Sequence, residues 1–142
     1  MVNKFLDAIT IALHKKFGDS YYYYVENVQQ DLRTPCFTVD MLNPLERSTN
    51  STSYYRTMPV VIHYFSSADT TTPKHECYAA GEDILEALEY IVIDNRIIRG
   101  EDMELTMVDD VLQVFVTYKF WTENKTEPTY MEDLEELHST TP

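Results

Sequence analysis

The stretch from Met103 to Trp121 constrains the fold of this chain more than any other. It contains two apolar segments around Asp109-Asp110, and Asp tolerates the positive φ angles of tight turns, so we predict a β-hairpin. Pairing Val108 with Val111 then places apolar residues opposite one another along a single face. The pairs are Met107 with Leu112, Leu105 with Val114, and Met103 with Val116. This face must be buried, and the second strand is long enough to be central in a sheet.

Two amphipathic helices are predicted elsewhere in the chain. Val2 to Phe17 carries apolar residues at helical spacing, and Gly18 is the expected stop. Thr72-Pro73 has the form of an N-cap followed by a first-turn proline, and opens a helix that we expect to run to about Ile91. Gly81 lies inside this second helix, and a small residue there is explained if the helix closely crosses another element.

Further strands are expected before the second helix. They cover Tyr21 to Val28, Cys36 to Leu42, and Tyr54 to Phe65, with the last two forming a hairpin. Pro59 lacks an N–H group, so the third strand should be a sheet edge or bulged at that point. Leu45 to Ser53 is polar and aperiodic, which predicts a mobile loop, and Ile97 to Arg99 is a candidate short strand.

These elements predict an α+β fold, in which two amphipathic helices cover one face of an antiparallel or mixed sheet. Residues 1–121 would form a single domain, and residues 122–142 an acidic linker and short C-terminal helix. A capping-box pattern, Thr129-Tyr130-Met131-Glu132, begins that helix, and Tyr130, Leu134 and Leu137 make its apolar stripe. A helix this short is unstable alone, so it docks on its own domain, docks on a neighbouring subunit, or frays.

The charge of the chain argues against a protein that holds nucleic acid by its phosphates. Asp and Glu total 24 against 11 Lys and Arg, giving a formal net charge of -13. Such a chain is poorly suited to gripping nucleic-acid phosphates, although an acidic wall would let DNA slide past; the simplest explanation of the charge is solubility. Cys36 and Cys77 suit buried free thiols in a reducing compartment. No signal peptide and no membrane-spanning stretch is predicted.

No enzyme, cofactor or metal site is predicted. The four histidines are scattered, and the pair His75 and Cys77 is spaced i and i+2, which does not share a helix face. Phosphate-binding and nucleophile motifs are absent, and three glycines leave little material for one. We instead predict contacts with other protein subunits, made by exposed tyrosines, arginines and the polar loop. The candidates are Tyr22, Tyr24, Arg33, Leu45, Glu46, Arg47, Tyr54, Tyr55, Arg56, Tyr130, Leu134 and Leu137.

Four segments together resemble a known family. They are Phe5 to Ile9, Thr34 to Val39, Met58 to Phe65, and Leu112 to Trp121. The chain resembles, over about residues 1–121, a small prophage protein of the tail-gene clusters of phages and phage-tail-like bacteriocins of Gram-positive bacteria. Its order of elements is similar to that of tail terminator proteins of long-tailed phages.

That resemblance implies a homohexameric ring that caps the head-proximal end of the tail tube and docks to the connector. The implied partners are the tail tube protein, the head-tail connector and a sheath; DNA would pass without specific binding. The implied location is the host cytoplasm during assembly and then the virion or phage-tail-like particle. Two alternatives stay open: another neck or head-completion ring protein, and an acidic non-enzymatic regulator that binds a basic partner.

Overall fold

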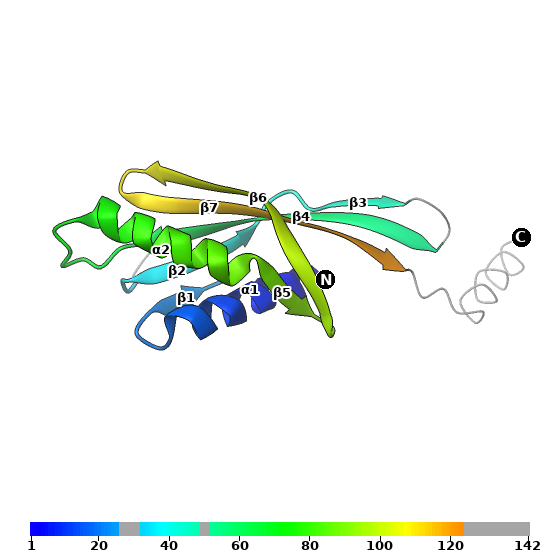
Figure 1. Ribbon diagram of the computed structural model, residues 1–142, viewed down its shortest axis with the longest axis horizontal. Coiled ribbons are helices and arrows are strands. Elements are labelled where there is room, and N and C mark those ends of the chain that lie inside the picture. Colours follow the sequence, from blue (N-terminus) through cyan, green and yellow to red (C-terminus); the bar gives the residue numbers. More distant parts are fainter. Residues whose placement is uncertain (26–31, 49–51, 124–142) are drawn as a thin grey trace, which may run out of the picture.

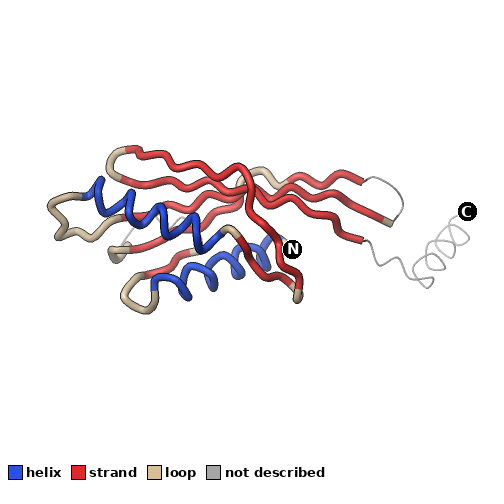
Figure 2. Tube along the Cα trace, viewed as in Figure 1, coloured by secondary structure: helices blue, strands red, loops and turns tan. Residues whose placement is uncertain are grey.

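The computed structural model describes residues 1–25, 32–48 and 52–123. In these residues a mixed seven-stranded sheet is combined with two helices, which confirms the predicted α+β class (Figures 1 and 2). The order of the strands in the sheet is β1-β2-β4-β7-β6-β5, with β3 paired to β4. The elements are α1 (Val2–Phe17), β1 (Tyr22–Tyr24), β2 (Cys36–Met41), β3 (Leu45–Ser48), β4 (Ser53–Phe65), α2 (Pro73–Leu88), β5 (Tyr90–Ile93), β6 (Arg96–Val108) and β7 (Val111–Glu123). The predicted C-terminal helix lies outside the described residues.

The core lies between the two helices and one face of the sheet (Figure 1). Phe5, Ile9 and Leu13 of α1 are fully buried, and α1 ends at Gly18, whose φ of 83° favours glycine, as predicted. On β7, alternate residues face this core. They are Leu112, Val114, Val116 and Tyr118, all with 0% exposure. The central position predicted for this strand is therefore confirmed.

The predicted register of the β6–β7 hairpin is confirmed for most of its length. Val108 pairs with Val111, and the pairs of Met107 and Leu105 follow as expected. Asp109 and Asp110 both have positive φ angles, 49° and 62°. The predicted pairing of Met103 with Val116 is wrong, because the register shifts between Glu101 and Glu104. Asp102, with a φ of 51°, forms part of this bulge.

Gly81 and Pro59 are residue types that are uncommon inside a helix and a strand, and the structure explains both. A Cβ atom built on Gly81 would lie 3.1 Å from side-chain carbons of Leu105 and Leu112, so α2 does cross the β6–β7 hairpin closely. β2 pairs with β4 as far as Val60, and β3 pairs with β4 from Thr57 onward, so Pro59 lies in the gap between these two partners. Its carbonyl accepts a hydrogen bond from the Leu42 N–H at 2.8 Å. Its nitrogen faces the same gap, where no ladder hydrogen bond is needed.

The second helix is shorter than predicted, and a strand was missed. α2 ends at Leu88 rather than about Ile91, and Ile91 instead belongs to β5. Two hydrogen bonds at the end of α2 explain this: the Leu88 carbonyl accepts from the Tyr118 hydroxyl at 2.7 Å, and the Glu89 carbonyl from the Gly100 N–H at 2.7 Å. Ile97 to Arg99 is not a separate short strand, because β6 runs unbroken from Arg96 to Val108.

The predicted mobile loop from Leu45 to Ser53 is wrong in part. Leu45 to Ser48 forms β3, which pairs antiparallel with β4, and Ser53 already belongs to β4. The strand escaped prediction because all four of its residues are exposed, so it has no apolar alternation. The predicted strand Tyr21 to Val28 is reduced to β1, Tyr22–Tyr24, within the described residues, which stop at residue 25 and resume at residue 32.

Candidate interaction surfaces

A three-stranded arm projects beyond the part of the sheet that the helices cover (Figures 1 and 2). We define the arm as β3, the first residues of β4 from Ser53 to Thr57, and the end of β7 from Lys119 to Glu123. β4 is its middle strand, because Arg56 pairs with Glu46 on one side and with Phe120 on the other. The strand β7 reaches Glu123, two residues beyond the predicted domain boundary. Within the described residues β4 is the one strand that pairs with β3, so β3 forms an edge of the described sheet.

One face of the arm combines aromatic, aliphatic and basic side chains. Because Arg47, Tyr55 and Trp121 are partners across the three strands, their side chains share this face. The ring centroids of Tyr55 and Trp121 are 5.0 Å apart. Leu45 and Trp121 are each 54% exposed, which is high for apolar side chains of this size. This face has the composition of a protein-binding surface, in which Trp, Tyr and Arg are enriched.

The opposite face of the arm carries a partly exposed ion pair and a cation–π contact. The Arg56 guanidinium lies 2.7 Å from the Glu46 carboxylate, and the side chain of Arg56 is only 21% exposed. Nearby, Arg96 donates a hydrogen bond to the Trp121 carbonyl at 2.9 Å, and its guanidinium lies 5.6 Å from the centre of the Phe120 ring. The Arg56–Glu46 pair joins two strands of the arm, and the contacts of Arg96 attach the arm to β6.

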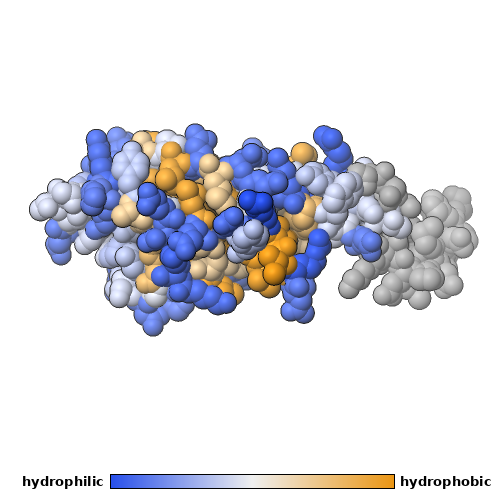
Figure 3. All heavy atoms as spheres, viewed as in Figure 1, coloured by the Kyte–Doolittle hydropathy of each residue, from blue (hydrophilic) through white to orange (hydrophobic). Residues whose placement is uncertain are grey.

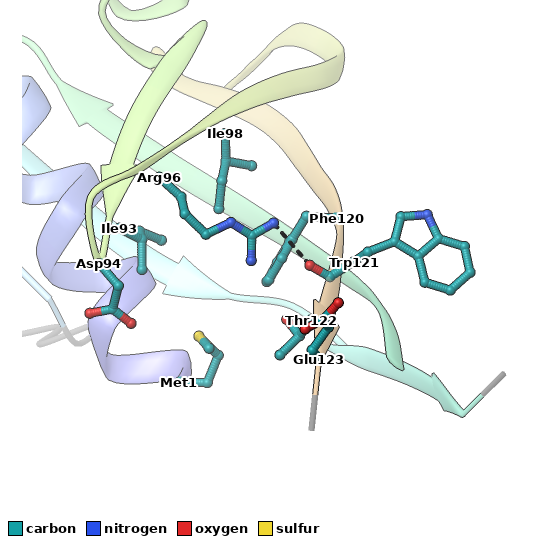
Figure 4. A pocket seen from close by; sticks show the side chains of 9 residues that line it. All are labelled: Met1, Ile93, Asp94, Arg96, Ile98, Phe120, Trp121, Thr122 and Glu123. Carbon is teal, nitrogen blue, oxygen red and sulfur yellow. Dashed lines mark hydrogen bonds between the residues drawn. The ribbon is translucent and has the colours of Figure 1, made fainter. Parts of the chain in front are cut away.

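An open hollow of about 570 Å³ lies at the base of the arm. Its lining comes from the start of α1, the β5–β6 turn and the end of β7, and includes Met1, Ile93, Ile98 and Phe120. In Figure 4 the Arg96 guanidinium points to the Trp121 backbone, while the indole ring points away from the hollow. The hollow is open and its lining is mostly apolar, which is a composition that suits contact with another protein.

The predicted tyrosine contacts form a separate surface on β1. Two of the four successive tyrosines, Tyr21 and Tyr23, pack against the Phe37 ring of the core. Tyr22 and Tyr24 lie on the other face, as strand alternation requires. Arg33 joins them, because its N–H donates to the Tyr24 hydroxyl at 3.2 Å and its guanidinium lies 5.9 Å from the centre of the Tyr22 ring.

The structure therefore divides the predicted contact residues into two groups. Tyr22, Tyr24 and Arg33 lie together beside β1. The arm holds the second group, Leu45, Glu46, Arg47, Tyr54, Tyr55 and Arg56. Tyr130, Leu134 and Leu137 lie outside the described residues.

A third surface was missed by the sequence analysis. Ile11 of α1, Tyr90 and Val92 of β5, and Ile97 of β6 are 57%, 54%, 61% and 72% exposed. Figure 3 shows hydrophobic side chains exposed over the β5–β6 hairpin. A groove of about 330 Å³ runs between α1 and the junction of α2 with β5. The signal available was Asp94-Asn95, a pair that suits a tight turn and follows the apolar run Tyr90 to Ile93.

Among the described residues, the core holds two free thiols and no metal-binding cluster. In residues 1–25, 32–48 and 52–123, no three His, Cys, Asp or Glu side chains are grouped so that they could hold a metal ion. Cys36 and Cys77 are both free and buried, as predicted, and burial raises the pKa of the Cys36 thiol to about 11. A thiol with so high a pKa is a poor nucleophile at neutral pH. Among the described helices, none is long and apolar enough to cross a membrane.

Comparison with known proteins identifies the family. No curated protein matches the chain significantly. One solved structure, known only by a sequence identifier, has 11% identity over 86% of this chain and 96% of its own, and its TM-score of 0.31 is too low to support any argument. The family model for phage tail terminator proteins, in contrast, matches residues 4–130. Because that match covers most of the sequence, the chain belongs to the phage tail terminator protein family and has a structural role in a phage tail.

Proposed function

We propose that this protein caps the head-proximal end of a phage tail tube. Six copies form a ring that stops tube growth and presents a docking surface to the head-tail connector. Membership of the terminator family supports the tail role. The observation that supports a contact with the tube most directly is the exposed arm, with its aromatic and basic face.

The arm has the properties of a surface that binds one chosen partner. β3 is an edge strand of the described sheet, and edge strands are places where a partner's strand can add to a sheet. On β3 the alternating charges of Glu46 and Arg47 limit indiscriminate edge pairing, as charged residues do on natural edge strands. The neighbouring Trp121 and Leu45 supply the exposed apolar area that would be buried in a specific contact.

The charge of the protein suits a ring through which DNA passes. A net charge of -13 provides few groups for neutralising phosphates, and phosphate neutralisation supplies most non-specific DNA affinity. A ring of such subunits would repel the DNA and let it slide. Specific DNA binding is not part of the proposed function.

The experiment that tests this proposal is tube assembly from purified tail tube subunits in the presence of the protein. The wild-type protein should shorten the tubes in proportion to its concentration. Leu45→Asp, which places a charge at an exposed apolar position of the arm face, should weaken this effect at least tenfold. Tyr78→Asp is the matched control, since Tyr78 on α2 is similarly exposed at 52% and lies away from the arm. The control should shorten tubes as the wild type does.

The tubes would keep their full length at every protein concentration if the proposal were wrong. Binding to the connector without any effect on tube growth would contradict the capping role and favour a neck or head-completion ring protein. Equal loss of activity in Leu45→Asp and Tyr78→Asp would show that the arm is not the surface that contacts the tube. The mass of the protein on tube ends, measured by quantitative labelling, should correspond to six copies.

A further inference from the structure

The groove beside α1 has the shape and composition of a helix-binding site. Its floor contains Ala8 and Ala12 of α1 and Ala87 of α2, and these small side chains permit close approach of another backbone. Ile11 and Val92 flank it and are more than half exposed. An apolar groove with small residues on its floor accommodates one face of an amphipathic helix.

One end of this groove is basic. Lys15 and Lys16 line it in the last turn of α1. Lys16 lies 3.2 Å from the Glu86 carboxylate, whereas no carboxylate of the described residues lies within ion-pair distance of Lys15. A neighbouring hollow that shares Ala8, Ile11 and Val92 with the groove is lined by Asp7 and Asp94, and Asp94 is paired with Lys4 at 3.1 Å. An acidic ligand is therefore favoured at the Lys15 end.

The C-terminal segment of the same chain has the complementary pattern. Tyr130, Leu134 and Leu137 are spaced i, i+4 and i+7, so on a helix they form one apolar stripe. The acidic residues of this segment are Glu132, Asp133, Glu135 and Glu136. A helix of this length needs tertiary packing of its apolar stripe to be stable.

The number of residues between the end of β7 and the C-terminal segment is compatible with docking in the groove. Glu123, the last residue of β7, and Met1 line the same hollow, so one open surface joins the end of β7 to the start of α1. With a helical rise of 1.5 Å per residue, Ala8 lies roughly 10 Å along α1 from Met1 and Lys16 about 12 Å further. Residues 124–129, when extended, span up to roughly 20 Å, and a helix of nine residues covers about 13 Å. A segment that starts beside Ala8 would bring Glu135 and Glu136 to the level of Lys15.

We propose that residues 129–138 dock in the groove of their own subunit, with the apolar stripe against Ile11 and Val92 and the acidic residues against Lys15. Docking covers the largest exposed apolar side chains of α1 and β5. It does not depend on the proposed tube contact, because the arm and the groove are separate surfaces.

Hydrogen exchange of the full-length protein, followed by mass spectrometry, tests the docking. Amides of residues 130–138 should exchange at least tenfold more slowly in the wild type than in Ile11→Asp, which places a charge in the groove. Tyr78→Asp is the control and should leave the exchange of these amides unchanged. A cooperative melt of Ile11→Asp establishes that the domain still folds. Equally fast exchange in wild type and Ile11→Asp would overturn the proposal.

Disulfide trapping identifies the groove and the subunit. The pair Leu137→Cys with Lys15→Cys should form an intrachain disulfide at least tenfold faster than Leu137→Cys with Lys74→Cys. Lys74 lies in the first turn of α2, whereas the groove lies beside the last turn. The native thiols of Cys36 and Cys77 are buried and should not compete. Equal rates for the two pairs would overturn docking in this groove, and disulfide-linked dimers as the main product would overturn docking within one subunit.

Discussion

Tyr118 joins the central strand to the end of α2 through one buried hydrogen bond. Its side chain is fully buried, and its hydroxyl donates to the Leu88 carbonyl at 2.7 Å. Burial raises the pKa of Tyr118 well above its usual value, so the hydroxyl stays protonated and remains a donor. Gly100 acts beside it, because a Cβ atom there would lie 2.7 Å from Val116 Cγ1 and 2.9 Å from the Leu88 oxygen. These two residues determine where the helix gives way to β5.

Tyr118→Phe should lower the free energy of unfolding by about 1–2 kcal/mol, because it leaves the Leu88 carbonyl buried without its donor. Urea denaturation monitored by circular dichroism measures this change. Tyr78→Phe, which removes the hydroxyl of an exposed tyrosine, is the control and should change stability little. An unchanged midpoint for Tyr118→Phe would show that the hydrogen bond contributes nothing to stability.

His63 should make the protein less stable in mild acid. Desolvation by burial lowers the pKa of His63 below its ordinary value, and the opposing effect of the Asp40 carboxylate, 4.0 Å away, is smaller. The unfolded chain therefore takes up a proton near pH 6.5 that the folded protein takes up only at lower pH. The contribution of neutral His63 to stability is complete above pH 6.5 and is lost as the pH falls below it.

The measurement is urea denaturation at pH 7.5 and pH 5.5 for the wild type and His63→Gln. The wild type should lose more stability between the two conditions than His63→Gln does. His75→Gln, at an exposed position of α2, is the matched control and should lose as much as the wild type. An identical loss in wild type and His63→Gln would contradict the assigned pKa direction.

At the scale of elements, local patterns predicted the β6–β7 hairpin well, and long-range contacts decided what was missed. The register followed from Asp109-Asp110 and the apolar alternation on both sides of it, which are local features. The sequence pattern does not indicate the bulge at Asp102, because Met103 continues the apolar alternation of this strand. β5 was assigned to α2 because Ile91 continues the helical spacing, and only contacts from Tyr118 and Gly100 end that helix.

Replacing Asp109-Asp110 by Asn-Gly should stabilise the protein by up to about 1 kcal/mol. Both residues have positive φ angles, at which Asn and Gly are less strained than Asp, and the change also removes two neighbouring negative charges. Thermal unfolding should show a higher midpoint than that of the wild type. Asp69→Asn, in the loop before α2, is a control for the loss of charge alone. A lower midpoint for Asn-Gly would contradict the turn geometry.

For the whole molecule, the sequence predicted the α+β class and the two-helix layer but not the shape that matters for contacts. The arm was not foreseen, because β3 is exposed on both faces and therefore carries no hydrophobic pattern. The predicted contact residues were chosen by type, and the structure brings Arg47 and Tyr55 together on one face of the arm while Tyr22 and Arg33 form another surface. The apolar surface around Val92 was not predicted, because it lies on β5, a strand that the sequence analysis did not predict.

Ending the chain after Glu123 should leave the domain folded, since residues 1–123 contain all the core residues that the structure describes. The truncated protein should unfold cooperatively, with a modestly lower midpoint because the groove beside α1 loses its proposed occupant. It should also bind more of a dye that reports exposed apolar surface. Loss of cooperative unfolding would show that residues 124–142 belong to the core.

The central claim is that this protein is the cap of a tail tube, and electron microscopy of tube ends tests it most directly. Purified tubes mixed with the protein should carry a ring-shaped density at one end only, with six-fold symmetry in end-on averages. The other end and the tube walls should stay bare. Tubes with no added density, or with protein at both ends or along the walls, would contradict the claim.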